Sequence, residues 1–258
     1  GQYGTSVLGE IIGSGKFTFP KSVYAVMDTL KYFIANKKNA LVIDFFAGSG
    51  TTMHAVNLLN SIDNGHRRCI MVTNNEVSAD EAKALDEKGY RPGDKEWDRL
   101  GIARYVTWPR TVCSIKGCNI DGKPLDGNYG CNVEQYTEIE GEIVNPETGK
   151  KIRGKVYKKE KEPAYPELAD LKMSDGFKTN AVFFKLSFLD KTSVALGRQF
   201  KELLPVLWMK GGAIGKCPAL ESDELPEMLI LPQNKMAVLI NEIYYSEFDA
   251  ELSQHPEI

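Results

Sequence analysis

Apolar residues recur at helical spacing between residues 19 and 37. The apolar positions are three or four residues apart: Val23, Val26, Met27, Leu30, Phe33 and Ile34. This spacing predicts a helix with one apolar face. Pro20 suits the first helical position, where a backbone N–H has no helical acceptor. The polar run at residues 36–39 predicts the end of this helix.

Two segments that favour buried strands follow: the continuous apolar run at residues 40–46 and RCIMVT at residues 68–73. Runs of this length without alternation are typical of strands that are covered on both faces. A second helical pattern, over residues 51–62, separates them. The order strand, helix, strand predicts an α/β fold, with a parallel sheet and helices on its faces.

Further along the chain the patterns are shorter and more polar. Residues 78–88 and 95–104 favour polar helices, and residues 106–117 fit either a helix or a strand. The remaining expectations are a β-hairpin whose arms flank the turn at 145–149, a strand over 180–189, a helix over 192–210 that bends at Pro205, and strands over 228–232 and 236–245. These patterns divide the chain into residues 1–117, an inserted loop and hairpin over 118–165, and a C-terminal α/β region over 166–258.

Composition and charge narrow the classes of protein. The formal net charge is -3, so contact with nucleic acid needs a local basic patch. No apolar run approaches the roughly 20 residues of a membrane span, and the start lacks a signal-peptide pattern. Five cysteines without regular spacing indicate reduced thiols in a cytoplasmic protein. Cys113, Cys118 and Cys131 lack a CxxC pair and a nearby histidine, so we expect no metal.

The segment DFFAGSGTTMHAV, residues 44–56, joins the first strand to a helix through two glycines. Small residues there let a ligand approach the backbone and the free N–H groups at the helix start. Met53 stands where a dinucleotide motif needs a third glycine, which disfavours a nicotinamide-dependent oxidoreductase. Glu76 follows the second strand, where a carboxylate can accept hydrogen bonds from a ribose. The pattern therefore predicts a nucleoside ligand.

Three segments carry a resemblance to a known family. DFFAGSGTT (44–52), GKFTFPKSVYAV (15–26) and CIMVTNNE (69–76) resemble, in order and spacing, motifs of β-class amino-group DNA methyltransferases. The modification (Mod) subunits of type III restriction-modification systems are of this kind. The resemblance implies a Rossmann-like core that binds S-adenosyl-L-methionine and a parent enzyme that methylates adenine N6 in DNA.

The resemblance also implies a set of cofactor-binding residues. Gly48 and Gly50 would allow close approach, Glu76 would bind the ribose, and Lys21 and Thr51 would lie near the methionine end. Core packing explains the two phenylalanines of the set equally well, turn amides could hold Asp44, and Lys21 could be a solvated residue. The full set is Phe17, Lys21, Asp44, Phe46, Ala47, Gly48, Ser49, Gly50, Thr51 and Glu76.

The catalytic motif of that family, Asp/Asn/Ser-Pro-Pro-Tyr/Phe/Trp, does not occur in the chain. We expect it upstream of residue 1, and we expect this chain to be a C-terminal portion that contributes no catalytic residue and is inactive alone. The parent would act on DNA, with a restriction subunit or a second copy as a further partner and without a membrane. The alternative is a methyltransferase-like module that only binds DNA or assembles subunits.

A basic run follows the turn of the expected hairpin. Its cationic residues are Lys150, Lys151, Arg153, Lys155, Lys158, Lys159 and Lys161. On alternating strands several of them would share a face, where they could contact a phosphate backbone. A solvated hairpin that resists edge-to-edge pairing explains the same charges. Both interpretations stay open.

Overall fold

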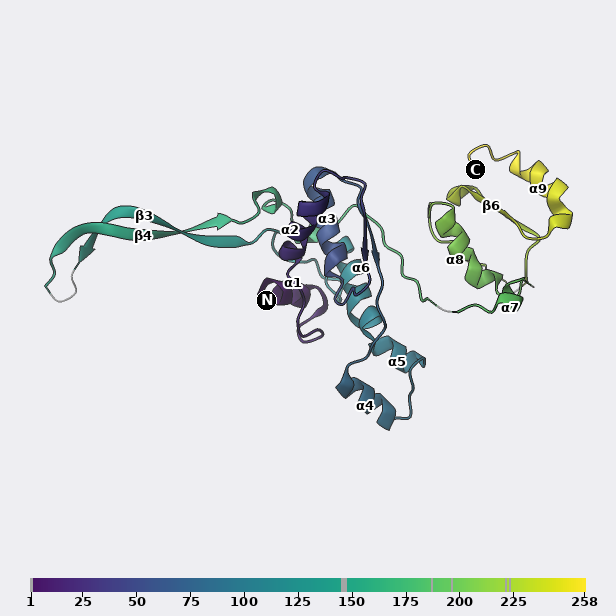
Figure 1. The fold of residues 1–258 in the computed structure, drawn as a ribbon, viewed down its shortest axis with the longest axis horizontal. Helices are drawn as coiled ribbons and strands as arrows, with labels where there is room; N and C mark the ends of the chain where they lie inside the picture. Colours follow the sequence, from purple (N-terminus) through teal and green to yellow (C-terminus); the bar gives the residue numbers. More distant parts are fainter. Residues whose placement is uncertain (1, 145–147, 187, 196, 221, 223) are drawn as a thin grey trace. The chain divides into compact units, whose positions relative to one another are not determined.

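The computed structural model describes residues 2–144, 148–186, 188–195, 197–220, 222 and 224–258. They form two compact units, residues 1–183 and 184–258 (Figure 1). The boundary differs from the expected one at residue 165. The reason is that Leu168, Met173 and Phe177 are buried in the core of the first unit.

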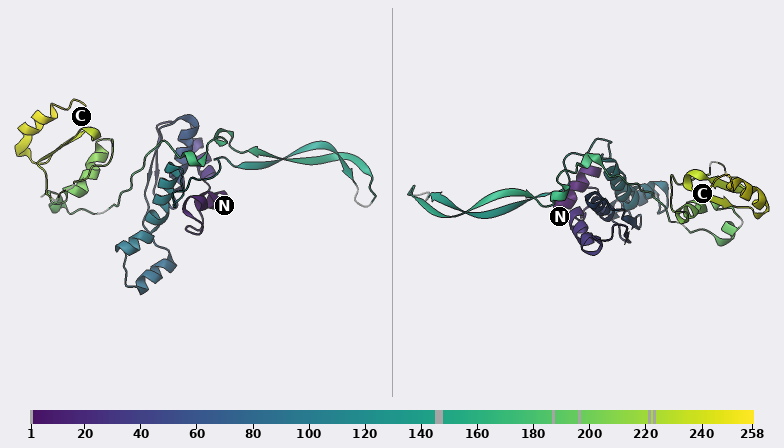
Figure 2. Two further views of the ribbon diagram at one scale, coloured as in Figure 1. Left: turned by 180° about the vertical axis from the view of Figure 1, so that it is seen from behind. Right: turned by 90° about the horizontal axis from the view of Figure 1, so that it is seen from above.

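The first unit has a helical core. Its apolar centre joins one face of α2 (Val23–Ile34), through Val23 and Met27, to Leu58 of α3 (Thr51–Asp63). Helix α3 also packs against β2 (Arg68–Met71), beside which it lies in Figures 1 and 2. The helical pattern over 51–62 is thereby confirmed. The other two helices of this core are α1 (Gln2–Ile12), for which the sequence patterns contained no expectation, and α6 (Trp108–Lys116).

Strands β1 (Leu41–Asp44) and β2 (Arg68–Met71) pair in parallel, as predicted. The register sets Leu41 opposite Arg68 and Asp44 opposite Met71. The prediction that both faces are covered is wrong. Leu41, Ile43 and Ile70 are 46%, 50% and 48% exposed, because the packed helices cover one face only.

The start of α2 differs from the prediction. The helix begins at Val23, with Ser22 as its N-cap in an extended conformation, and Pro20 lies outside it. The backbone of Pro20 and Lys21 packs against Gly4 of α1, which holds this segment out of the helix. The expected end before the polar run is confirmed, since Ala35 is the C-cap.

The connection after β2 is helical. The polar helices are confirmed as α4 (Ala79–Glu87) and the shorter α5 (Lys95–Leu100). The ambiguous segment at 106–117 is a helix. A π-helical turn, η1 (Ala103–Thr107), continues directly into α6.

The predicted hairpin is confirmed and is longer than expected. Strand β3 (Asn132–Val144) pairs antiparallel with β4 (Lys151–Pro163). Within the predicted turn, residues 145–147 lie outside the described residues. Two short 3-10 turns, η2 (Pro166–Leu168) and η3 (Met173–Asp175), then return the chain to the core of the first unit.

The second unit has its own small core, in which Leu204 and Trp208 meet Met236. The predicted strand at 180–189 is wrong, because its described residues pair with no strand. The long helix is divided, and residue 196 of that expectation lies outside the described residues. The second of the two predicted C-terminal strands ends early, and a helix follows it. The elements are α7 (Lys191–Ala195), α8 (Phe200–Lys210), β5 (Met228–Leu231), η4 (Pro232–Asn234), β6 (Met236–Leu239), η5 (Glu242–Tyr244) and α9 (Tyr245–Leu252).

Across the described residues, every helix is too short or too polar to cross a membrane.

Candidate functional site

The candidate site is the turn that joins β1 to α3, which we call the glycine turn (residues 45–50). Gly48 and Gly50 have φ angles of 50° and 77°, in the left-handed region that favours glycine. Gly50 is the N-cap of α3. The N–H of Ala47 donates to the carbonyl of Val72 at 3.2 Å, so the turn lies against the segment that follows β2.

Helical packing from η1 and α6 constrains the turn from inside the protein. A Cβ atom on Gly50 would lie 3.3 Å from Cγ2 of Thr107, which is tighter than most carbon contacts. The hydroxyl of Thr107 donates to the carbonyl of Gly48 at 2.6 Å. The absence of a side chain at Gly50 therefore has a packing reason within the chain itself.

The carboxylate of Asp44 accepts two hydrogen bonds from groups at the turn and the start of α3. Its Oδ1 accepts the backbone N–H of Phe46 at 3.0 Å, and its Oδ2 accepts the hydroxyl of Thr52 at 2.6 Å. This is the arrangement of an acid held by turn groups, one of the two interpretations of Asp44. A contact of Asp44 with the cofactor stays a prediction.

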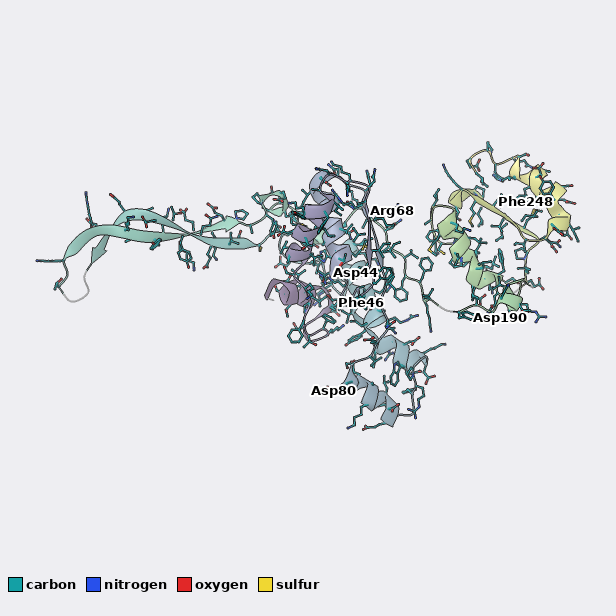
Figure 3. All side chains as sticks on the ribbon, in the orientation of Figure 1. Asp44, Phe46, Arg68, Asp80, Asp190 and Phe248 are labelled. Carbon is teal, nitrogen blue, oxygen red and sulfur yellow. The ribbon has the colours of Figure 1, made fainter. Side chains whose placement is uncertain are left out.

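Three of the expected site residues have exposed side chains: Lys21, Phe46 and Glu76. Phe46 is 92% exposed and lies beside Asp44 at the end of β1 (Figure 3). Glu76 lies in the coil beyond β2, where its carboxylate accepts a long hydrogen bond of 3.4 Å from Asn74. Among the described contacts, none joins the side chain of Lys21 or Glu76 to the glycine turn.

Phe17 is the expected residue that the structure brings to the turn. Its ring carbon Cζ would lie 3.7 Å from a Cβ on Gly48, and the ring also packs against the core. Phe17 therefore combines the two interpretations: one edge of its ring faces the turn, and the rest of the ring packs against the core.

The hydroxyls of Ser49 and Thr51 point into the protein. Both residues are buried, and Nη1 of Arg110 donates to the Ser49 carbonyl at 3.2 Å, to Ser49 Oγ at 3.0 Å and to Thr51 Oγ1 at 2.7 Å. The two hydroxyls lie 3.1 Å apart. A ligand at the glycine turn would therefore meet the backbone of these residues rather than their hydroxyls.

Behind Arg110 a histidine and a tyrosine complete a buried polar chain. Nη2 of Arg110 lies 3.5 Å from His54 Nδ1, and His54 Nε2 lies 2.8 Å from Tyr129 Oη. A guanidinium has only donors, so Nδ1 must accept and the imidazole proton is on Nε2, from which it is donated to Tyr129.

Burial governs the protonation of this chain. Burial and the charge of Arg110 hold the pKa of His54 well below its usual range, so the imidazole is neutral. Burial lowers the pKa of Arg110 to about 10, which leaves it charged at neutral pH, and burial raises the pKa of Tyr129.

Sequence reasoning missed Arg110 as a site residue. The available signal was a cation on the apolar side of a helical pattern, with Val106 four positions before it and Cys113 three positions after it. That spacing indicates a buried charge only once the segment is known to be helical and packed.

The cysteines are free thiols. Burial raises the pKa of Cys69 to about 12, so this thiol is protonated. Within the described part of the chain, no three His, Cys, Asp or Glu residues come together as a metal-binding group.

Parts of the chain are similar in sequence to known proteins. The chain is 42% identical over 71 residues, 28% of its length, to the type II methyltransferase M.KpnI of Klebsiella pneumoniae. It is 42% identical over 87 residues, 34% of its length, to the Mod subunit of the type III restriction-modification enzyme EcoPI of Escherichia phage P1. It is also 42% identical over 64 residues, 25% of its length, to the StyLTI Mod subunit of Salmonella typhimurium.

The chain thus resembles methyltransferases of restriction-modification systems. The resemblance is to the Mod subunits of type III enzymes and to one type II methyltransferase, which confirms the resemblance seen in the sequence motifs. The matched stretches span 16%, 13% and 10% of the lengths of these three relatives. No protein-family profile matches the chain.

Proposed function

We propose that this chain binds S-adenosyl-L-methionine for a site-specific DNA methyltransferase of a restriction-modification system, with adenine N6 as the methylated position. The observation that carries the proposal is the join between Ala47 and Val72. It sets a glycine turn and the start of α3 against the end of the neighbouring parallel strand. In open α/β sheets, ligands bind at the carboxyl ends of the strands.

Each of the three exposed site residues would contact one part of S-adenosyl-L-methionine. Glu76 accepts hydrogen bonds from the ribose hydroxyls, Lys21 pairs with the carboxylate of the methionine part, and Phe46 covers an apolar surface of the cofactor. The backbone at Gly48 makes the close approach, because a side chain there would intervene. The bound cofactor supplies the methyl group, and this chain contributes orientation and electrostatic complementarity.

Methyl transfer needs a group that grips the target amine after the base leaves the stack. No Pro-Pro pair exists in the 258 residues, so we propose that this chain holds the donor without transferring the methyl group by itself. DNA, and a restriction subunit or a second copy, are the proposed partners of the whole enzyme, which would act in the cytoplasm without a membrane.

A second candidate is a methyltransferase-like module that binds DNA or assembles subunits without a cofactor. The exposed positions of Lys21 and Glu76 favour it, since among the described contacts neither side chain is joined to the glycine turn. A nicotinamide-dependent oxidoreductase is less consistent with the chain, because Met53 replaces the third glycine. Cofactor binding separates the three candidates.

Isothermal titration with S-adenosylhomocysteine tests the proposal, with NADH as the competing ligand class. We expect binding of the former only, and Glu76→Ala should weaken it by about 2–3 kcal/mol, the contribution of hydrogen bonds to a charged group. Glu87→Ala is the matched control, since Glu87 is an exposed acid at the far end of α4. Absence of binding by the unaltered chain would refute the proposed function, and unchanged affinity in Glu76→Ala would refute the ribose assignment alone.

A further inference from the structure

Arg110 is the largest of the fully buried residues in the described part of the first unit, and it carries a full charge. It is 1% exposed, and its acceptors within the described residues are all uncharged: Ser49 O, Ser49 Oγ, Thr51 Oγ1 and His54 Nδ1. Its Nε has no acceptor among these residues. Burying a guanidinium without a carboxylate is costly, so an aliphatic residue would suit a purely structural role at least as well.

Arg110 contacts the residues on both sides of Gly50, which has a left-handed backbone conformation. Ser49 precedes Gly50 and Thr51 follows it, and one nitrogen of the guanidinium, Nη1, holds both. A glycine in this conformation is free to leave it, since glycine populates many others. Contacts on both sides of Gly50 restrict that freedom.

His54 and Tyr129 orient the guanidinium. His54 Nδ1 accepts a hydrogen bond from Nη2 of Arg110, and His54 Nε2–H donates one to Tyr129 Oη. These contacts orient the guanidinium plane from the side opposite the turn, while Nη1 faces the turn. The rings of His54 and Tyr129 also meet edge to face, with centroids 5.4 Å apart, and Phe177 contacts both rings. The contacts are therefore continuous from Tyr129 through His54 and Arg110 to Ser49.

We propose that Arg110 is the positioning residue of the cofactor turn: it holds Ser49 and Thr51 on either side of Gly50, so that the turn is in its ligand-binding conformation before the ligand arrives. This inference rests on the proposed function for its ligand. It assigns to Arg110 no contact with the cofactor.

The proposal explains why the residue is arginine. A planar fork with five donors reaches Ser49, Thr51 and His54 at once, whereas a lysine is a single point charge on a flexible stem. Arg110→Lys keeps the charge and most of the length and loses the fork. It is therefore the variant that separates positioning from the presence of a charge.

The first measurement needs no ligand. Amide hydrogen exchange of the whole chain compares residues 46–51 with the interior of α3 and α6. In Arg110→Lys we expect exchange at 46–51 to quicken about tenfold, as for the loss of a hydrogen bond to a charged group, with the helix interiors unchanged. Equal acceleration in all three segments, or none at the turn, would overturn the proposal.

The second measurement is affinity for S-adenosylhomocysteine in the same variant. We expect Arg110→Lys to lower this affinity about tenfold. Combined with Thr51→Val, its effect should be non-additive, because the two changes remove the same contact. Arg99→Lys, the same change at an exposed arginine of α5, is the control and should bind normally. Additive losses, or normal affinity in Arg110→Lys, would overturn the proposal.

Two further outcomes are decisive. If Arg110→Lys does not fold, Thr51→Val breaks the same contact from the other side, and unchanged exchange at the turn in that variant counts against the proposal. If the unaltered chain binds no cofactor, the proposed function fails, while the exchange comparison still decides whether Arg110 holds the turn.

Discussion

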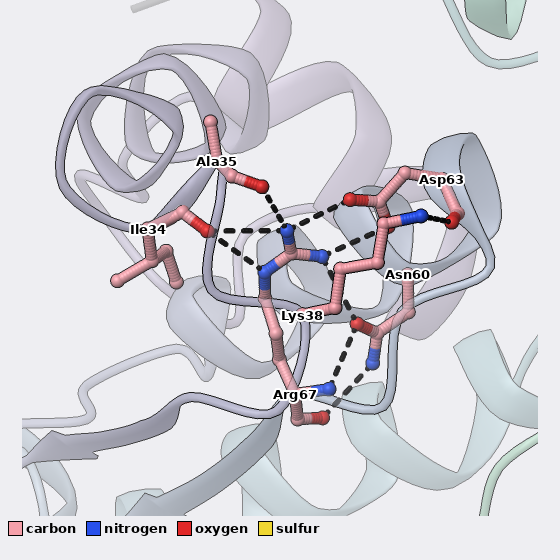
Figure 4. Close-up of polar contacts among 6 residues, drawn as sticks. All are labelled: Ile34, Ala35, Lys38, Asn60, Asp63 and Arg67. Atoms are coloured by element: carbon pink, nitrogen blue, oxygen red, sulfur yellow. Dashed lines mark hydrogen bonds and ion pairs between the residues drawn. The ribbon is translucent and has the colours of Figure 1, made fainter.

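Arg67 holds Asp63 through two parallel hydrogen bonds, 2.9 Å from Nη1 to Oδ1 and 2.8 Å from Nη2 to Oδ2 (Figure 4). The same guanidinium donates to the carbonyls of Ile34 and Ala35 at 3.1 Å and 2.9 Å. Its side chain is fully buried, with 0% exposure. Arg67, which directly precedes β2, thereby joins the carboxyl ends of α2 and α3.

Removal of this acid should destabilise the first unit. Asp63→Ala leaves a buried guanidinium without its carboxylate, and we expect a loss of about 2 kcal/mol in the free energy of unfolding. Relief of an acid at a helix carboxyl end reduces the loss by a few tenths of a kcal/mol. Denaturant titration measures it.

The exposed pair of Arg91 and Asp86 is the matched control, because Asp86 also lies near the end of a helix. Its side chains are 68% and 53% exposed, so Asp86→Ala should cost less than about 1 kcal/mol. Equal losses of unfolding free energy in the two variants would contradict the conclusion that the ion pair of Arg67 and Asp63 stabilises the fold through its burial.

Gly50→Ala should impair the glycine turn by two separable effects. Alanine in the left-handed region costs about 1–2 kcal/mol, and its Cβ meets Cγ2 of Thr107 at 3.3 Å. Gly89→Ala shares only the first effect, since Gly89 has φ 84° and open space around it. We expect the larger loss of unfolding free energy in Gly50→Ala, and part of the difference should return in Gly50→Ala/Thr107→Ser, which removes Cγ2 and keeps the hydroxyl. Equal losses at both glycines would show that the contact with Thr107 has no energetic effect.

The neutral His54 predicts loss of stability in mild acid. Its pKa is lowered in the folded chain, so below about pH 6.5 the unfolded chain binds a proton that the folded chain does not. The stability contributed by neutral His54 is complete above that pH and should fall by about 1.4 kcal/mol per pH unit below it, until the folded pKa is reached. Arg110 and Tyr129, which face the imidazole, do not change protonation in this range.

Denaturant titrations between pH 7.5 and pH 5 check this slope. His54→Gln should flatten it, whereas His66→Gln, at an exposed position, should leave it unchanged. The prediction fails if the slope persists in His54→Gln.

The charges of the hairpin are balanced across its two strands. Lys151, Lys155 and Lys159 pair with Glu142, Glu138 and Glu134 at 2.9, 2.6 and 2.7 Å. Together β3 and β4 carry six Lys or Arg residues and six Glu residues. The balance favours the solvated hairpin over a stripe that contacts phosphates.

We therefore expect that changing these three lysines to glutamine leaves the slope of log DNA affinity against log salt unchanged. Changing the three paired glutamates to glutamine would free the lysines and steepen that slope by up to about three units. Filter binding of the chain to duplex DNA at several salt concentrations measures both. A flatter slope in the lysine variant would favour contact with the phosphate backbone instead.

The sequence by itself determined the strand, turn, helix and strand around residues 41–71, and also the hairpin. These elements follow from local periodicity and from glycines whose backbone needs are local. Local pattern also placed the ligand hypothesis at the turn, since small residues between a strand and a helix let a ligand approach the backbone and the free N–H groups at the helix start.

Tertiary structure decided what covers each element. The apolar run at residues 40–46 indicated a strand but could not indicate that Leu41 and Ile43 stay exposed, because burial depends on the neighbours that the fold supplies. Residues 180–189 alternate like a strand, yet a strand also needs a pairing edge. There, Phe183 instead packs against Trp108 and Arg104.

The burial of Arg110 is likewise a tertiary outcome. Its charge alone predicts a solvated residue. Only the packing of α6 beneath the glycine turn brings it to the Ser49 carbonyl, the Thr51 hydroxyl and His54. These contacts join residues about sixty positions apart in the chain. No local pattern contains them, because the free energy that holds a buried charge comes from groups that meet only when the chain has folded.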